Sequence, residues 1–286
     1  MDNEQRYYIG LPQWQHDAWD TGPLAGRGSA LRRYAHHFNS VEGNTTFYGV
    51  PSQSTVARWA DETPANFRFC FKFRQEISHR SALVASHPKV LEQLAALEPL
   101  REKMGLLCLQ LPQSFGPEGL SELEHFVAGL PPEFNYSVEV RNLAFFEKGE
   151  EERRLNQLLG QYAVNRVMFD TRALFGQPAT DAATLEAQQK KPRVPLHVLA
   201  TGRQPQVRFI APMAYQQAER YLDQWVTKVV SWLDAGLEPY LFFHTPDNRC
   251  APQLARWFVA KLELQRPQAR GFVPWVDSGE QTMLFK

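Results

Sequence analysis

The sequence has few cysteines, and they form no pattern that indicates a disulfide framework or a metal site. Only three occur among 286 residues, at Cys70, Cys108 and Cys250. They lie far apart, with no CxxC pair and no Cys/His spacing typical of zinc. A sparse and odd set of cysteines is typical of reduced thiols inside the cell, so a disulfide-stabilised secreted fold is not expected.

Long hydrophobic runs and an excess of charge of one sign are missing too. Lys plus Arg and Asp plus Glu both number 31, which gives a formal net charge of zero and no bulk attraction to nucleic acid or to an anionic membrane. No apolar run approaches the ~18–20 residues that a membrane span needs. The N-terminal stretch MDNEQRYYIG is polar and unlike a signal peptide. We expect a soluble, cytoplasmic protein with no membrane partner.

Common catalytic motifs are absent as well. The sequence contains no HExxH, no glycine-rich phosphate loop and no GxSxG nucleophile elbow. Ligation of a metal by Glu42, Glu139, Asp170 and His244 is conceivable, but no spacing requires it. We therefore predict no metal site, and the sequence specifies no cofactor.

What the sequence does contain is one repeated unit. Short apolar runs alternate with segments of helical periodicity at intervals of roughly 30–40 residues, the size of a βαβ unit. We interpret eight of these apolar runs as strands. Eight strands that alternate with helices predict a single (β/α)8 barrel over residues 1–286, with a doubly wound open sheet as the competing architecture. The predicted strands are Tyr7–Gly10, Ser40–Thr46, Phe67–Phe73, Gly105–Leu111, Tyr136–Arg141, Asn165–Asp170, Val207–Ala211 and Pro239–His244.

A long excursion over residues 171–206 interrupts this rhythm after the sixth strand. It is too long for an ordinary connection, and such segments often act as lids over a site, although a solvated loop is the simpler alternative. We expect a helix around Asp181–Lys191 and then a stiff, extended arm with Pro192 and Pro195. Because βα connections emerge at the C-terminal face of a barrel, the excursion should lie over that face. Its basic residues would then close over an anionic substrate; they are Lys190, Lys191, Arg193 and Arg203.

Alternation along the strands predicts which side chains enter the barrel. In FRFCFKF the phenylalanines share the face that must meet helices, so Lys72 points inward near the strand's C-terminal end. Similar reasoning places polar groups from six strands at one rim, where active sites of this architecture lie. The inward polar residues predicted in this way are Glu42, Asn44, Lys72, Gln110, Glu139, Arg141, Asp170 and His244. A purely structural network of ion pairs among these charges is the alternative interpretation.

The same segments carry a family resemblance. IGLPQW at Ile9–Trp14, FNSVEGNTTFY at Phe38–Tyr48 and LQLPQSFGP at Leu109–Pro117 resemble the YecE-like family of uncharacterised proteins. The match extends through YSVEVRN and NRVMFDTR to LFFHTPD at Leu241–Asp247. The resemblance implies a TIM-barrel-like fold and no established activity. Many relatives carry paired asparagines after the last strand and His-Gly after the arginine of the seventh, where this chain has HTPD and, after Arg208, Phe-Ile-Ala-Pro.

Three functions fit these features. The first is an enzyme, of hydrolase or isomerase type, that acts on a small polar substrate, phosphorylated or polyhydroxy. Glu42 with Glu139 or Asp170 would be its catalytic acid and base, a glycosidase being one version. Ligand-binding groups would be Asn44, Lys72, Gln110, Arg141, Arg208 and His244. The second function is nucleic-acid binding or processing through a local basic patch. The third is a non-catalytic ligand-binding protein. The oligomeric state is left open.

Overall fold

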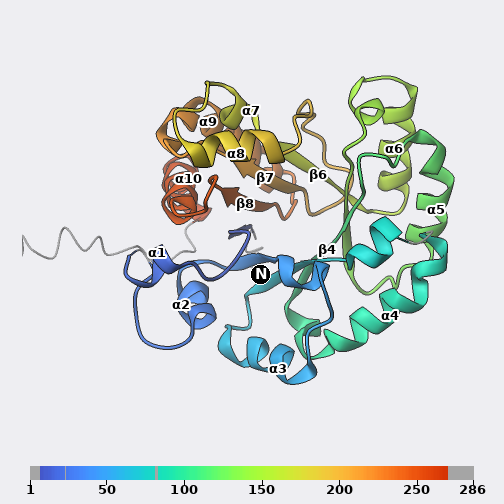
Figure 1. Cartoon of the computed structure of the whole chain (residues 1–286), viewed down its shortest axis with the longest axis horizontal. Coiled ribbons are helices and arrows are strands. Elements are labelled where there is room, and N and C mark those ends of the chain that lie inside the picture. The colour runs from blue at the N-terminus through green and yellow to red at the C-terminus, as the bar shows by residue number, and fades with distance from the viewer. Residues whose placement is uncertain (1–6, 23, 81–82, 270–286) are drawn as a thin grey trace, which may run out of the picture.

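Eight parallel strands form a nearly closed barrel in the computed structural model, which describes residues 7–22, 24–80 and 83–269 (Figure 1). Neighbouring strands pair in the order β1-β8-β7-β6-β5-β4-β3-β2. This confirms the predicted (β/α)8 architecture. The strands are β1 (Tyr8–Gly10), β2 (Ser40–Gly43), β3 (Arg68–Lys72), β4 (Met104–Gln110), β5 (Asn135–Glu139), β6 (Asn165–Asp170), β7 (Gln206–Ile210) and β8 (Tyr240–His244).

Helices alternate with the strands and ring the barrel (Figure 1). Several begin at a residue whose side chain caps the first turn, such as Ser29, which accepts a hydrogen bond from the Arg32 backbone N–H. The helices are α1 (Asp17–Asp20), α2 (Ala30–His37), α3 (Gln53–Glu62), α4 (His87–Ala96), α5 (Leu120–Ala128), α6 (Glu150–Gln161), α7 (Arg172–Phe175), α8 (Ala182–Lys190), α9 (Glu219–Asp234) and α10 (Ala251–Gln265). In the described parts of the chain, no helix combines the length and the apolar character that crossing a membrane requires.

The barrel closes where β1 meets β2. A Cβ on Gly10 would lie 2.3 Å from the carbonyl oxygen of Ser40, so only glycine allows this approach of the two backbones. The Asn39 side chain bridges the strands. Its Oδ1 accepts a hydrogen bond from the Ile9 N–H and its Nδ2 donates one to the Tyr7 carbonyl, and both bonds are 2.8 Å long. The Glu42 N–H donates to the Leu11 carbonyl at 3.0 Å. These contacts fix the backbone of β2 at the position where Glu42 enters the barrel.

Two apolar layers hold the strands in place. The outward face of β3 buries Phe69 and Phe71 against Trp59 of α3, with ring centroids 6.3 and 5.9 Å apart. Inside the barrel, a cluster that includes Tyr8 and Tyr240 fills the N-terminal end, and these two rings stack at 4.3 Å. Because that end is filled with apolar side chains, polar groups that point inward gather toward the C-terminal end.

The connection from β6 to β7 departs from the regular pattern. The helix predicted around Asp181–Lys191 is α8, and the Asp181 side chain caps it by accepting from the Thr184 N–H. The chain then runs without helix or strand to β7. Along this arm His197 binds Glu152 of α6, and Thr201 Oγ1 donates to the Val164 carbonyl at 2.7 Å. The arm therefore leaves the C-terminal face and descends along the outside of the barrel beside α6 and β6.

One predicted strand is too long. The sequence indicated a strand over Ser40–Thr46, but β2 ends at Gly43 and a 3-10 turn follows over Asn44–Phe47. Thr46 explains the turn, since its hydroxyl donates to the Lys72 carbonyl at 2.8 Å and ties the segment to the end of β3. Asn44 thus reaches the C-terminal face from a turn and not from an inward strand position.

Candidate functional site

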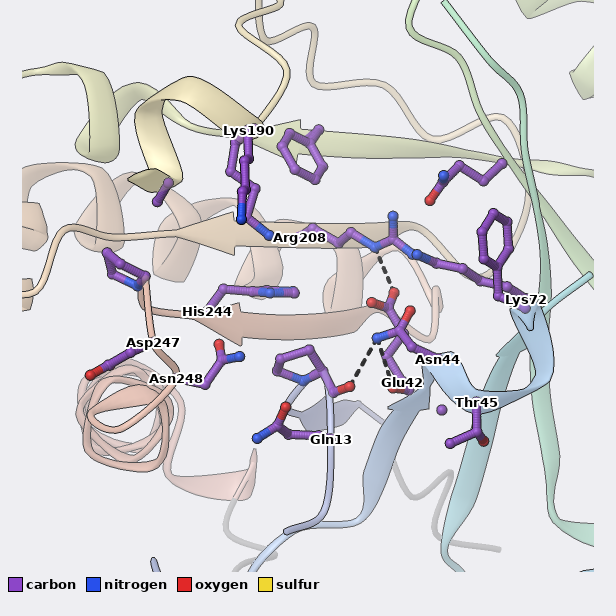
Figure 2. A pocket seen from close by; sticks show the side chains of 18 of the residues that line it. Gln13, Glu42, Asn44, Thr45, Lys72, Lys190, Arg208, His244, Asp247 and Asn248 are labelled. Carbon is purple, nitrogen blue, oxygen red and sulfur yellow. Dashed lines mark hydrogen bonds and ion pairs between the residues drawn. The ribbon is translucent and has the colours of Figure 1, made fainter. Parts of the chain in front are cut away.

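A cavity of about 930 Å³ opens at the C-terminal ends of the strands (Figure 2). Most of the predicted site residues line it, and they come from β2 and the turn after it, from β3, β4, β7 and β8, and from the segment after β5. Those residues are Glu42, Asn44, Lys72, Gln110, Arg141, Arg208 and His244. Inward alternation was thus a sound guide for most strands, because the apolar residues between these positions pack against the helices.

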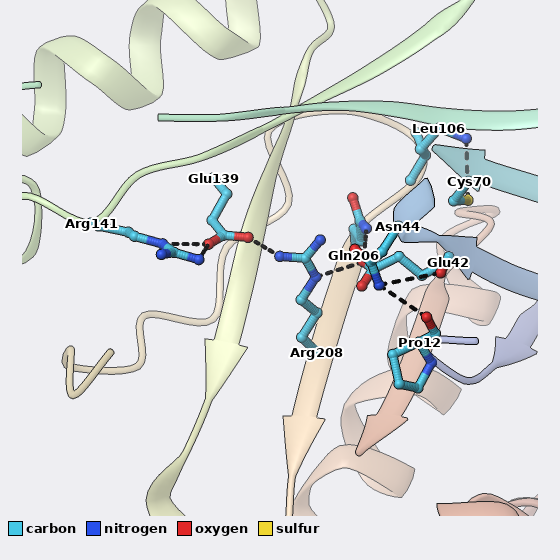
Figure 3. A network of polar contacts seen from close by, with 9 residues as sticks. All are labelled: Pro12, Glu42, Asn44, Cys70, Leu106, Glu139, Arg141, Gln206 and Arg208. Carbon is cyan, nitrogen blue, oxygen red and sulfur yellow. Dashed lines mark hydrogen bonds and ion pairs between the residues drawn. The ribbon is translucent and has the colours of Figure 1, made fainter. Parts of the chain in front are cut away.

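Arg208 is the centre of a buried ion-pair network at the cavity floor (Figure 3). Its Nε donates a hydrogen bond to Glu42 Oε1, at a distance of 2.6 Å, and its Nη1 donates one to Glu139 Oε2. All three side chains are at most 3% exposed. Burial alone would lower the pKa of Arg208, but the charge and hydrogen bond of Glu42, together with Cys108 and Cys70, outweigh burial and raise the pKa, so the guanidinium stays charged.

Glu139 supports this floor from below and does not itself line the cavity. Besides Arg208 it binds Arg141, whose Nε and Nη2 lie 2.8 and 2.7 Å from Glu139 Oε1. Arg141 is partly exposed and does line the cavity. Glu139 therefore orients two arginines toward the cavity, and its carboxylate is an acceptor held by both of them.

Asp170 lies on the opposite side of its strand from the predicted one. The sequence placed Met168 and Asp170 inside the barrel, but Asp170 is fully buried against the helix layer. Its carboxylate accepts from Trp225 Nε1 of α9 at 2.7 Å and from Arg172 at 2.9–3.0 Å. Phe169 reaches the cavity instead. The cause is that β6 carries apolar residues on both faces, and Asp170 finds its donors outside the barrel.

Lys72 enters the cavity from the end of β3 without an acidic partner. Within the described residues its Nζ makes no hydrogen bond or ion pair, and it lies 5.7 Å from the centre of the Phe47 ring. Burial first, and the neighbouring Arg208 charge second, lower the pKa of Lys72 to about 7, although the Glu42 charge opposes this. Near neutral pH the amine is therefore present in both protonation states.

Several buried polar atoms around the cavity lack a partner among the described residues. Arg208 Nη2 is one, although the other guanidinium nitrogens are engaged by Glu42 and Glu139. The others include Asn44 Oδ1, Gln110 Oε1, His244 Nε2 and Asn248 Oδ1. Burial lowers the pKa of His244 well below its usual range, and the nearby Lys191 charge acts in the same direction, so His244 is neutral. Buried groups of this kind are normally satisfied, which points to a polar ligand.

The excursion contributes one face of α8, from Ala183 to Lys190, and the residues just after it to the cavity wall. Lys190, Lys191 and Pro192 line it, but Lys190 is exposed and paired with Glu186. Lys191 is partly buried, and burial lowers its pKa. The other basic residues predicted to act as a lid lie elsewhere: Arg193 packs over the Phe175 ring at 5.3 Å, and Arg203 is exposed on the arm, away from the cavity lining.

Sequence reasoning missed a few residues of the site. Gln206 Nε2 donates to Glu42 Oε1 at 3.4 Å; it lies two positions before Arg208, so a strand begun one residue earlier would have placed it on the inner face. Phe47 and Asn248 line the cavity from a turn and a loop, for which alternation gives no signal. Within the described ranges, no group of three His, Cys, Asp or Glu side chains is arranged to hold a metal ion.

Comparison with known proteins agrees with this architecture. Residues 8–277 match the family described as "Protein of unknown function DUF72". The UPF0759 protein YecE of Escherichia coli K12 is 43% identical over 278 residues, which cover 97% of this chain and 99% of that protein.

Two solved structures are similar in fold. A DUF72 family protein of Enterococcus faecalis V583 is 19% identical, with a TM-score of 0.66 over 94% of this chain and 97% of that one. A DUF72 family protein of Thermotoga maritima MSB8 is 18% identical, with a TM-score of 0.65 over 91% of this chain and 98% of that one. The two structures share the fold, and the match of residues 8–277 to the family model together with the 43% identity to YecE establishes that the chain belongs to the DUF72 family.

Proposed function

We propose that the protein is an enzyme that acts on a small polar substrate with an anionic group, a phosphate or a carboxylate. The observation that carries this proposal is the unpartnered Nη2 of Arg208 at the cavity floor. Glu42 and Glu139 hold the rest of that guanidinium rigidly, which leaves one donor for a ligand. A fixed arginine of this kind is suited to phosphate or carboxylate oxygens.

The balance of charge around the cavity also favours an anion. The carboxylates of Glu42 and Glu139 are offset by Arg208 and Arg141, and the carboxylates of Glu186 and Asp247 are paired with Lys190 and Arg249. Lys72 and Lys191 add positive charge that no acidic side chain of the described chain pairs with directly. A volume of about 930 Å³ fits a small molecule rather than a polymer. Asn44, Gln110 and His244 offer polar atoms for the uncharged part of the substrate.

We assign the proton-transfer role to Lys72 instead of the carboxylates. Ion pairs with arginine need ionised carboxylates, so Glu42 and Glu139 are occupied in positioning the anion-binding groups. Lys72, with a pKa of about 7, exchanges protons near neutral pH, as a general acid or base must. A hydrolase or an isomerase would use such a group.

Thermal denaturation with a panel of small compounds tests this function. Inorganic phosphate, sugar phosphates and short carboxylates should raise the melting temperature, while uncharged sugars of the same size should not. Ligand at a hundred times its Kd stabilises the folded chain by about 2.7 kcal/mol, a shift that is readily measured. Failure of every anion to shift the transition would contradict the proposal.

The same measurements separate the two competing functions. Oligonucleotide binding with a steep salt dependence, in the absence of binding by monophosphates, would favour a nucleic-acid protein. Binding of a small anion without turnover of any bound compound would favour a non-catalytic receptor.

A further inference from the structure

Lys72 is held in the cavity by its backbone, while its amine is left free. The Lys72 carbonyl accepts hydrogen bonds from Thr46 Oγ1 and from Gln93 Nε2, both at 2.8 Å. These two contacts, from the turn after β2 and from α4, fix the base of the side chain. Lys190, by comparison, is exposed and ion-paired with Glu186. The cavity therefore presents an amine that is fixed at its base and has no hydrogen-bond acceptor at its tip among the described residues.

The surroundings of this amine are those of a nucleophile. A lysine amine attacks carbon only when it is neutral, and burial or a nearby cation provides the neutral form at physiological pH. Both conditions hold for Lys72, because its side chain is partly buried in the cavity wall and the Arg208 charge lies within the same cavity. A general base needs only to exchange a proton, but this amine also faces open cavity space.

We propose that Lys72 forms a covalent imine with the carbonyl group of an anionic substrate, an oxo acid or a phosphorylated aldehyde or ketone. This inference rests on the proposed function, because Arg208 and Arg141 must bind the anionic group for the carbonyl to reach Lys72. It narrows the substrate class from polar anions in general to anions that carry a carbonyl.

The step requires no oxidant or reductant. The nitrogen lone pair of Lys72 forms a bond to the carbonyl carbon, and the π pair of C=O moves to oxygen. A proton passes from nitrogen to that oxygen and gives the carbinolamine. The hydroxyl then takes a proton from solvent and leaves as water, while the nitrogen lone pair forms C=N. The iminium withdraws electrons from the adjacent carbon, which is how such intermediates assist isomerisation or C–C cleavage.

Pyridoxal 5′-phosphate is a suitable probe, because it carries an aldehyde and a phosphate on one small molecule. The full chain is incubated with the probe near neutral pH, reduced with borohydride and digested, and the modified lysines are identified by mass spectrometry. We expect Lys72 to be modified at least about tenfold faster than Lys190, since a larger fraction of its amine is neutral. Inorganic phosphate should slow the modification of Lys72 and leave unchanged that of Lys148, an exposed lysine outside the cavity lining.

Modification of exposed lysines or of Lys191 with Lys72 left intact would overturn the inference. The Lys72→Arg variant serves as the control, because it keeps a positive charge and removes the primary amine. It should still be stabilised by phosphate while it loses the fast-reacting site. Stabilisation of the wild type by phosphate without modification of Lys72 would refute the imine alone, whereas absence of both effects would refute the proposed function as well.

Discussion

Glu42 and Arg208 bind each other across the barrel interior, from β2 and β7, with Arg208 Nε 2.6 Å from Glu42 Oε1. Going round the barrel across the closure of β1 on β2, only β8 and β1 lie between these two strands, so the pair joins the two sides of the closure. The contact is buried on both sides. It serves the fold by linking distant strands, and it serves the site by fixing the guanidinium that faces the cavity.

Replacing Glu42 by Gln should lower the free energy of unfolding by about 3–5 kcal/mol. The change removes one partner of a buried pair and leaves the Arg208 charge poorly compensated. Chemical denaturation measures the loss. Glu150→Gln, at the exposed pair with Arg153 on α6, is the matched control and should change stability much less. Equal effects of the two substitutions would show that the buried network contributes little to stability.

Asp170→Asn should destabilise the chain without weakening anion binding. Asp170 accepts hydrogen bonds from Arg172 and Trp225 outside the barrel, and losing its charge should cost about 1–3 kcal/mol. Denaturation and phosphate titration of the same variant give the two readouts. A large loss of phosphate affinity in a stably folded Asp170→Asn protein would show that Asp170 is part of the anion site.

Lys191→Met should weaken phosphate binding by about fivefold, which corresponds to ~1 kcal/mol. Lys191 lines the cavity, is partly buried and carries charge that a bound anion would meet. Lys148→Met is the control, since Lys148 is exposed and lies outside the cavity lining. Isothermal titration with phosphate compares them. If both variants bind as the wild type does, α8 does not contribute to the anion site.

The pKa of Lys72 makes stability depend on pH in a defined direction. Its value falls from 10.5 to about 7 on folding, so between these values the unfolded chain binds more protons. The free energy of unfolding therefore rises as the pH increases from about 7 to 10.5. Over this range the folded chain no longer has to bury Lys72 in its charged form. Lys72→Met should be more stable than the wild type below about pH 7, and the difference should shrink toward about pH 10. A difference that stays constant over this range would mean that Lys72 is not buried as described.

The sequence was informative wherever one face of a strand was clearly apolar. In β3 the alternation of Phe69 and Phe71 with Lys72 left a single orientation compatible with a helix layer, and the structure has that orientation. In β6 both faces are apolar, and alternation alone could not decide between Phe169 and Asp170. What decided it is the position of Trp225 and Arg172, which is a tertiary contact with no local signal.

The sequence also could not show which residues pair with the charged side chains that point into the barrel. A network of ion pairs among the inward charges was the alternative interpretation, but alternation did not show that Glu42 pairs with Arg208 and that Lys72 takes no part within the described residues. Strand alternation gives the face on which a side chain lies and not the strand from which its partner comes. The difference matters chemically, because it leaves the Lys72 amine free and occupies the two carboxylates that the sequence had suggested as acid and base.

The most direct test of the account is an NMR titration of the Lys72 side chain in isotopically labelled protein, assigned with the Lys72→Arg variant. Without ligand the midpoint should lie at about 7. With saturating phosphate it should rise, because a bound anion near the amine favours the ammonium form. A midpoint near the ordinary 10.5 that does not respond to phosphate would contradict both the free amine and the anion site beside it.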